Sequence, residues 1–264
     1  MKRLPRVLHK PLVWLFGAVT VRIRSGPNAG KRWTVTSSGR GYVAGNFERE
    51  RLAAMESLTR PGDVFWDVGA HQGYITLAAS KWVGPAGRVV SFEPSTANRS
   101  MLERHVRWNK LDNVEVFPFA ISDTDGVAQF GGSGGSVSFR LGRGDESVAT
   151  RTMRSLIEND SQPRPTVLKL DVERSEAAAL RGGTDYLSPD MIVWISLHGR
   201  ELYHECRGLL AGRGMTVYES AKLRDVIDPV KPWGGDKELL AIGSERTLSA
   251  AERDAVSRFS ARAD

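Results

Sequence analysis

The 264-residue chain contains one cysteine, Cys206, so neither an intrachain disulfide nor a cysteine-rich zinc site can form. A single cysteine is typical of a reducing compartment and favours a cytoplasmic location. The apolar segment at residues 11–21 is too short to span a bilayer, which takes roughly 20 residues. With 41% hydrophobic and 26% charged residues, the composition argues against a disordered or collagen-like chain.

Acidic residues are missing from the first 40 positions, which hold nine lysines and arginines. The chain has 37 basic and 31 acidic residues, so residues 41–264 carry 28 basic and 31 acidic side chains, a net charge of −3. The basic character therefore belongs to the N-terminal segment. A nucleic-acid enzyme usually spreads basic charge around its site, so we expect no nucleic-acid partner.

Residues 1–10 are basic and residues 11–21 are mostly apolar, which superficially resembles a signal peptide. No small-residue cleavage site follows, so a cleaved signal is disfavoured. Two alternatives stay open for residues 1–24. They form either a packing segment that leads into a hairpin or a peripheral anchor on anionic lipid. In the second case the inserted side chains would be Leu12, Trp14, Leu15 and Phe16.

Strand and helix patterns alternate along most of the chain, which predicts an α/β fold with a mostly parallel sheet and helices on both faces. We expect an N-terminal hairpin from residues 19–24 and 32–36, a second hairpin or flap from 127–130 and 136–141, and a C-terminal helix after Ser249. The expected strands are 64–68, 88–92, 114–120, 166–172, 191–197, 215–218 and 238–242, the last two antiparallel at the sheet edge. The expected helices are 47–59, with Asn46 as its N-cap, 72–82, 96–108, 175–187 and 200–213. Three regions result: an N-terminal segment (1–45), the main domain (46–245) and a C-terminal helix (246–264).

The dinucleotide pattern Gly-x-Gly-x-x-Gly is also missing. The first strand instead ends in Asp67-x-Gly69-Ala70-x-x-Gly73. An acid at that strand end would repel a pyrophosphate, but it suits a ligand with a cationic amine. S-adenosylmethionine is such a ligand. Its amino group could meet Asp67 and its carboxylate the N-terminus of the following helix. Asp67 could instead simply cap that helix.

Two further strand ends fit the same ligand. The second expected strand ends in Glu93-Pro94-Ser95, where an acid can accept both ribose hydroxyls. The third ends near Ala120, in position to meet the adenine. Because ligands of such sheets bind at the carboxyl ends of the strands, the three segments predict one cofactor site. The alternative for Glu93 is an unrelated surface acid.

The sequence resembles the FkbM family of S-adenosylmethionine-dependent methyltransferases. The resemblance implies a class I, Rossmann-like methyltransferase fold with seven strands, and transfer of a methyl group to a hydroxyl of a sugar, glycan, glycolipid or natural product. It also implies a cofactor-side role for Glu48. The segments that carry it are Gly45-Asn46-Phe47-Glu48, Pro61-Gly62-Asp63-Val64, Asp67-Val68-Gly69-Ala70-His71-Gln72-Gly73, Phe92-Glu93-Pro94, Asn113-Val114-Glu115-Val116, Leu168-Lys169-Leu170-Asp171-Val172-Glu173 and Asp236-Lys237-Glu238-Leu239-Leu240.

Three positions depart from the family pattern, all on the expected acceptor side. Arg174 stands where the family usually has glycine, Ser155 lies in a stretch that usually carries two acids, and Ser196 replaces a usual glutamate. They bear on the acceptor and the base, not on the cofactor.

Methyl transfer to a hydroxyl needs a positioned acceptor and a group that takes its proton. Asp171, at the end of the fourth strand, is the natural base or metal ligand. Glu173 and Glu176 follow it, and His198 ends the fifth strand on the same rim. These catalytic candidates could alternatively hold a divalent cation through Asp171, Glu173 and His198. The alternatives to a methyltransferase are a non-catalytic, membrane-associated binding protein and, with less support, a nicotinamide-dependent oxidoreductase.

Overall fold

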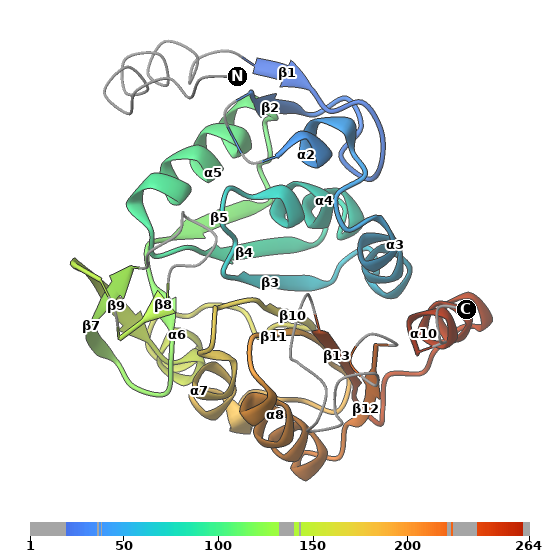
Figure 1. The fold of residues 1–264 in the computed structure, drawn as a ribbon. Coiled ribbons are helices and arrows are strands. Elements are labelled where there is room, and N and C mark those ends of the chain that lie inside the picture. The colour runs from blue at the N-terminus through green and yellow to red at the C-terminus, as the bar shows by residue number, and fades with distance from the viewer. Residues whose placement is uncertain are drawn as a thin grey trace.

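The computed structural model describes residues 20–260 except 36, 38, 132–139, 143, 221, 222 and 224–236. Its centre is a seven-stranded sheet in the order β12-β13-β11-β10-β3-β4-β5, in which β13 runs antiparallel to both neighbours (Figure 1). The expected fold class is confirmed. The strands are β3 (Val64–Val68), β4 (Arg88–Phe92), β5 (Val114–Phe117), β10 (Val167–Leu170), β11 (Ile192–Leu197), β12 (Thr216–Glu219) and β13 (Lys237–Ile242).

The chain builds this sheet outward from β3 in both directions. It first adds β4 and β5 on one side, and later returns to add β10 and β11 on the other. The switch point therefore lies between β3 and β10. In an open α/β sheet, the carboxyl ends of the strands at this point form the ligand crevice.

Side chains at alternate positions of the strands belong to two apolar layers, one on each face of the sheet. On β11, Val193 and Ile195 pack with helices α6 to α8, whereas Ile192 and Trp194 pack with α3, α4 and α10. The helices are α2 (Arg40–Ala44), α3 (Arg49–Leu58), α4 (Tyr74–Trp82), α5 (Thr96–Trp108), α6 (Met153–Glu158), α7 (Glu176–Arg181), the 3₁₀ turn η3 (Thr184–Tyr186), α8 (Arg200–Gly212) and α10 (Ala250–Ser260).

The N-terminal hairpin is confirmed. Strands β1 (Thr20–Arg22) and β2 (Arg32–Thr34) pair antiparallel, and Trp33 stacks on the buried ring of His105 in α5 at 3.9 Å between centroids. The candidate anchor, residues 1–19, lies outside the described residues. In the part of the chain that the structure describes, no helix has the length and apolarity needed to cross a membrane.

Several boundaries differ from expectation. The third strand stops at Phe117 because Pro118 has no N–H for the ladder. The next residues form β6 (Ala120–Ile121) in a second sheet of order β6-β9-β7-β8. Its other strands are β7 (Gly126–Gly131), β8 (Arg140–Leu141) and β9 (Glu146–Arg151). The expected second hairpin is confirmed in β7 and β8, with residues 136–139 outside the described part, whereas β9 was not expected.

Two expected helices are shorter than the pattern suggested. Helix α7 ends at Arg181, because two glycines follow and glycine costs about 1 kcal/mol in a helix. Helix α3 begins at Arg49, and its N-cap position is Glu48 instead of Asn46. At the C-terminus, Ser249 and Glu252 bond reciprocally as a capping box.

Candidate functional site

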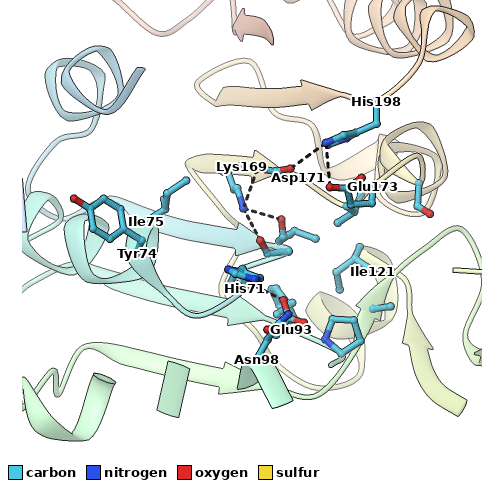
Figure 2. Close-up of a pocket in the computed structure, with 18 of the residues that line it drawn as sticks. His71, Tyr74, Ile75, Glu93, Asn98, Ile121, Lys169, Asp171, Glu173 and His198 are labelled. Carbon is cyan, nitrogen blue, oxygen red and sulfur yellow. Dashed lines mark hydrogen bonds and ion pairs between the residues drawn. The ribbon is translucent and has the colours of Figure 1, made fainter. Parts of the chain in front are cut away.

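A cavity of about 320 Å³ opens at the carboxyl ends of β3, β4, β10 and β11, at the switch point of the sheet. Figure 2 shows Glu93 and Asn98 at one end and His198 at the other. The lining includes nine of the twelve predicted site residues: Glu48, Gly69, Ala70, Glu93, Pro94, Ala120, Asp171, Glu173 and His198. The remaining three, Asp67, Gly73 and Ser95, are buried and do not line the cavity.

Two glycines let the turn after β3 fit closely between its neighbours. Both have positive φ, 75° at Gly69 and 91° at Gly73. A Cβ on Gly69 would lie 1.9 Å from the carbonyl oxygen of Asp171, and one on Gly73 would lie 2.4 Å from a methyl of Leu102. Gly73 therefore acts by allowing helix packing, while Gly69 lets the turn after β3 approach the backbone of Asp171 at the end of β10.

Asp67 does not have the place that its motif suggested. Its side chain is fully buried, pairs with Lys169 Nζ at 3.0 Å, and accepts a hydrogen bond from Thr76 Oγ1 at 2.6 Å. Direct contact with a ligand amine does not fit this geometry, because the Asp67 side chain is fully buried and is not among those that line the cavity. Lys169, which does line the cavity, also donates to the carbonyl oxygen of Gly69 at 2.7 Å. Asp67 thus orients a buried lysine beneath the turn.

Glu93 is the acid of the expected ribose site. Its two oxygens accept the backbone N–H groups of His71 at 2.7 Å and Ser95 at 3.0 Å. Burial raises the pKa of Glu93 to about 7, against the opposing effect of these bonds and of Asn98. Ser95 caps α5 through its side chain and reaches the site only through its N–H. Glu93 is therefore a fixed, buried acceptor at the end of β4.

The predicted acceptor-side residues converge as expected from a parallel sheet. His198 Nε2 lies 3.6 Å from Asp171 and 3.5 Å from Glu173, and His198 Nδ1 lies 2.6 Å from the fully buried carboxylate of Glu176. Figure 2 shows the His198 ring facing Asp171 and Glu173. We call Asp171, Glu173, Glu176 and His198 the acidic rim.

The acidic rim fixes the charge of its histidine. Burial lowers the pKa of His198, but the bond to Glu176 and the charges of Asp171 and Glu173 outweigh it and raise the pKa to about 9. At neutral pH His198 is therefore an imidazolium, and both of its ring nitrogens are hydrogen-bond donors. A general-base role for His198 would need the neutral ring, so this geometry favours Asp171 as the proton acceptor.

Asp171 is surrounded by cations. Lys169 and Arg51 lie 3.9 and 3.8 Å from its Oδ2. Burial raises its pKa, but the charges of Lys169, Arg51 and His198 together hold it below the usual value. Asp171 is thus an ionised carboxylate in the lining of the cavity.

Sequence reasoning missed Arg51, which α3 brings to the rim. Its guanidinium is 6% exposed and pairs with Glu48 at 2.8 Å, Glu238 at 2.7 Å and Asp171 at 3.8 Å. Burial lowers the pKa of Arg51, but the three carboxylates raise it by more than burial lowers it. The guanidinium therefore stays charged. The signal in the sequence was an arginine one helical turn after Glu48, on the buried side of an amphipathic helix.

Comparison with known proteins decides the family. A model of the methyltransferase FkbM domain matches residues 67–225, more than half of the chain. The chain belongs to the FkbM methyltransferase family. This is a family of S-adenosylmethionine-dependent methyltransferases.

Solved structures give distant likenesses. The FkbM methyltransferase of Methylobacillus flagellatus is 18% identical at a TM-score of 0.49, over 68% of this chain and only 43% of that protein. A precorrin-6y C5,15-methyltransferase of Geobacter metallireducens is 11% identical at 0.49, over 78% and 93% of the two chains. Fibrillarin of Aeropyrum pernix, solved with bound S-adenosylmethionine, is 16% identical at 0.45, over 73% and 74%. No curated protein sequence matched the chain.

The three departures from the FkbM pattern have different surroundings. Ser155 is buried against Asp125, at 2.9 Å, and does not line the cavity. Ser196 lies in register opposite Glu238 of β13, whose carboxylate pairs with Arg51. Arg174 has a φ of 78°, a left-handed conformation that glycine adopts without strain.

Arg174 uses its side chain to connect two loops of the rim. The guanidinium donates to the carbonyl oxygen of His198 at 2.9 Å and pairs with Glu201 at the start of α8. The loop after β10 is thereby joined to the loop after β11. The arginine therefore provides a contact that the usual glycine lacks.

A metal-binding alternative finds no matching geometry in the described residues, among which no three histidine, cysteine or acidic side chains are grouped to hold an ion. At the rim, the Nδ1 atom of His198 is engaged by Glu176 at 2.6 Å.

Proposed function

We propose that this FkbM protein transfers the methyl group of S-adenosylmethionine to a hydroxyl oxygen of a sugar, glycan, glycolipid or natural product. The observation that carries the proposal is the acidic rim: an ionised Asp171 and a protonated His198 lie 3.6 Å apart in the lining of the cavity. Such a pair offers one acceptor and one donor to neighbouring hydroxyls, which is how a sugar diol is recognised.

The opposite end of the cavity suits the cofactor. Glu93 would accept the ribose hydroxyls, Ala120 and Pro94 would border the adenine, and the turn at Gly69 and Ala70 would hold the methionine part. The close glycine turn and the buried acceptor at Glu93 fit this group. When bound, S-adenosylmethionine supplies an electrophilic methyl group.

Asp171 would take the proton of the acceptor hydroxyl. Because its pKa is held low, it is a weak base, and it cannot remove the proton in advance of the reaction. The hydroxyl becomes strongly acidic as its oxygen gains the methyl group, so a weak, well-placed carboxylate suffices. Glu173 and His198 would hold the acceptor during this step, since both face the cavity next to Asp171.

The decisive experiment incubates the protein with radiolabelled S-adenosylmethionine and fractionated saccharide, glycolipid and small-molecule extracts. Asp171→Asn should lower turnover about 10²–10⁴-fold, as expected for loss of a general base. The affinity for S-adenosylmethionine should stay unchanged. Asp185→Asn, at an exposed acid outside the cavity, is the matched control. The label of the product should resist mild base, which releases methanol from methyl esters, and should leave as methyl iodide on ether cleavage by hydrogen iodide.

Three outcomes would contradict the proposal. Label on nitrogen or carbon would reject O-methylation. Normal turnover of the Asp171→Asn protein would reject Asp171 as the base. Cofactor binding without turnover on any fraction would favour the non-catalytic binding protein. The nicotinamide alternative has no support from the family to which the chain belongs.

A further inference from the structure

The β1–β2 hairpin carries an unusual pair of like charges. Arg22 and Arg32 lie directly opposite each other in its register, and both are exposed. Like charges at opposed positions destabilise a two-stranded ribbon. Arg24 follows in the same strand direction and is also exposed, and Lys31 precedes Arg32. We call Arg22, Arg24, Lys31 and Arg32 the basic hairpin.

No carboxylate neutralises the basic hairpin within the described residues, where none of its four side chains forms an ion pair. Lys81, whose charge acts on Lys31, pairs with Glu56 at 3.8 Å and is not part of this cluster. Burial and the charge of Lys81 together lower the pKa of Lys31. A surface that holds cations together without acids gains free energy when an anionic partner binds.

A single aromatic side chain, Trp33, separates the basic hairpin from residues that line the cavity. Trp33, the residue after Arg32 in β2, stacks on Tyr42 at 6.0 Å with an interplanar angle of 5°, and meets Tyr74 edge-on at 5.6 Å. Tyr42 and Tyr74 line the cavity. A partner on the hairpin would therefore sit beside the methyl-transfer site.

The rest of the chain decides which anionic partner fits. Residues 41–264 have a net charge of −3, and the rim of the cavity is acidic, so a long polyanion wrapped around the site would be repelled. A flat anionic surface would not have to surround the acidic rim, and it could meet the exposed Arg22, Arg24 and Arg32. In the sequence, the 19 residues before β1 combine four lysines and arginines with Trp14 and Phe16, a composition that suits a lipid interface.

We propose that the basic hairpin docks the protein onto an anionic lipid surface, next to the cavity. Arginines near such a surface act through the negative potential of the headgroups and lose effect with added salt. Docking through this surface does not depend on the identity of the acceptor.

The test is sedimentation of the full chain with vesicles made of equal parts phosphatidylcholine and phosphatidylglycerol. Arg22→Ser with Arg32→Ser should weaken binding about 30-fold, from about fivefold for each cation near the surface. Since Arg22 also bonds the carbonyl of Gly30, Arg24→Ser with Arg32→Ser is the second variant and should weaken binding equally. Arg253→Ser with Arg258→Ser, in α10, is the control and should bind like the wild type.

Cofactor affinity measured on every variant shows that the fold is intact. Binding should disappear on pure phosphatidylcholine and fall with salt, and inorganic phosphate should compete only weakly because it presents no surface. Equal vesicle binding by wild type and both hairpin variants would overturn the proposal. So would tighter binding to a single-stranded oligonucleotide than to the anionic vesicles, or full competition by inorganic phosphate.

Discussion

Glu176 controls the charge of His198, and its replacement by glutamine gives a sharp prediction. The buried Glu176 carboxylate lies 2.6 Å from His198 Nδ1 and is the first of the groups that raise the pKa of His198, from 6.5 to about 9. A difference of this size corresponds to about 3 kcal/mol in favour of the imidazolium. Glu176→Gln keeps the shape and removes the charge, so the pKa of His198 should fall by at least about one unit.

The same change should flatten the pH dependence of stability. A histidine whose pKa is raised on folding contributes stability that is fully present below its unfolded pKa, 6.5, and is lost as the pH rises through about 9. The wild type should therefore lose stability across that window, and the Glu176→Gln protein should lose less. Histidine NMR titration and urea unfolding at several pH values measure both effects.

Glu173→Gln is the matched control for this prediction. Glu173 lies farther from the ring, at 3.5 Å from Nε2, and is 31% exposed, so its removal should lower the pKa of His198 less than Glu176→Gln does. An unchanged His198 titration in a folded Glu176→Gln protein would refute the reasoning. It would mean that Asp171 and the local dipoles hold the proton without Glu176.

Three further predictions concern the cofactor, the rim and the N-terminus. Glu93→Ala should weaken S-adenosylmethionine binding at least about tenfold by calorimetry, since a bond to a charged group is worth about 1.5–3 kcal/mol; wild-type affinity should also fall as the pH drops below about 7 and Glu93 takes up a proton. Arg174→Gly should leave the melting temperature nearly unchanged, because relief of about 1 kcal/mol of left-handed strain offsets the lost bond to His198. Hydrogen exchange should nevertheless quicken around His198, and unchanged exchange would argue against the link. Deleting residues 1–16 should preserve cofactor affinity and reduce sedimentation with anionic vesicles, whereas equal sedimentation would count against an anchor.

The sequence predicted the rim because parallel strands bring their carboxyl ends to one edge. Asp171 and His198 follow two apolar runs of the buried type, so their meeting required only that the two strands be neighbours, as β10 and β11 are. Gly69 and Glu93 follow the same logic on β3 and β4. Strand ends are therefore the part of this site that periodicity can place.

Side chains that act across elements were harder to predict. Lys169 lies in the middle of an apolar strand, and its partner Asp67 is 102 positions away on a different strand. A lysine in a run otherwise read as buried was the available signal, since buried lysines need a partner. Arg51 reaches the rim from a helix, where its only signal was its spacing from Glu48, and strand β9 lacks the strict apolar–polar alternation that would have predicted it.

The place of β13 has a consequence for how this domain can be divided. Residues 67–225 match the family, yet β13 lies later in the chain and fills the slot between β11 and β12. A fragment cut at those limits would expose the unpaired edge of β11 and leave β12 without its ladder, which invites aggregation. It would also lose Arg51 and Glu238, and with them one side of the Asp171 environment. The cooperative folding unit therefore extends beyond the homologous segment at both ends.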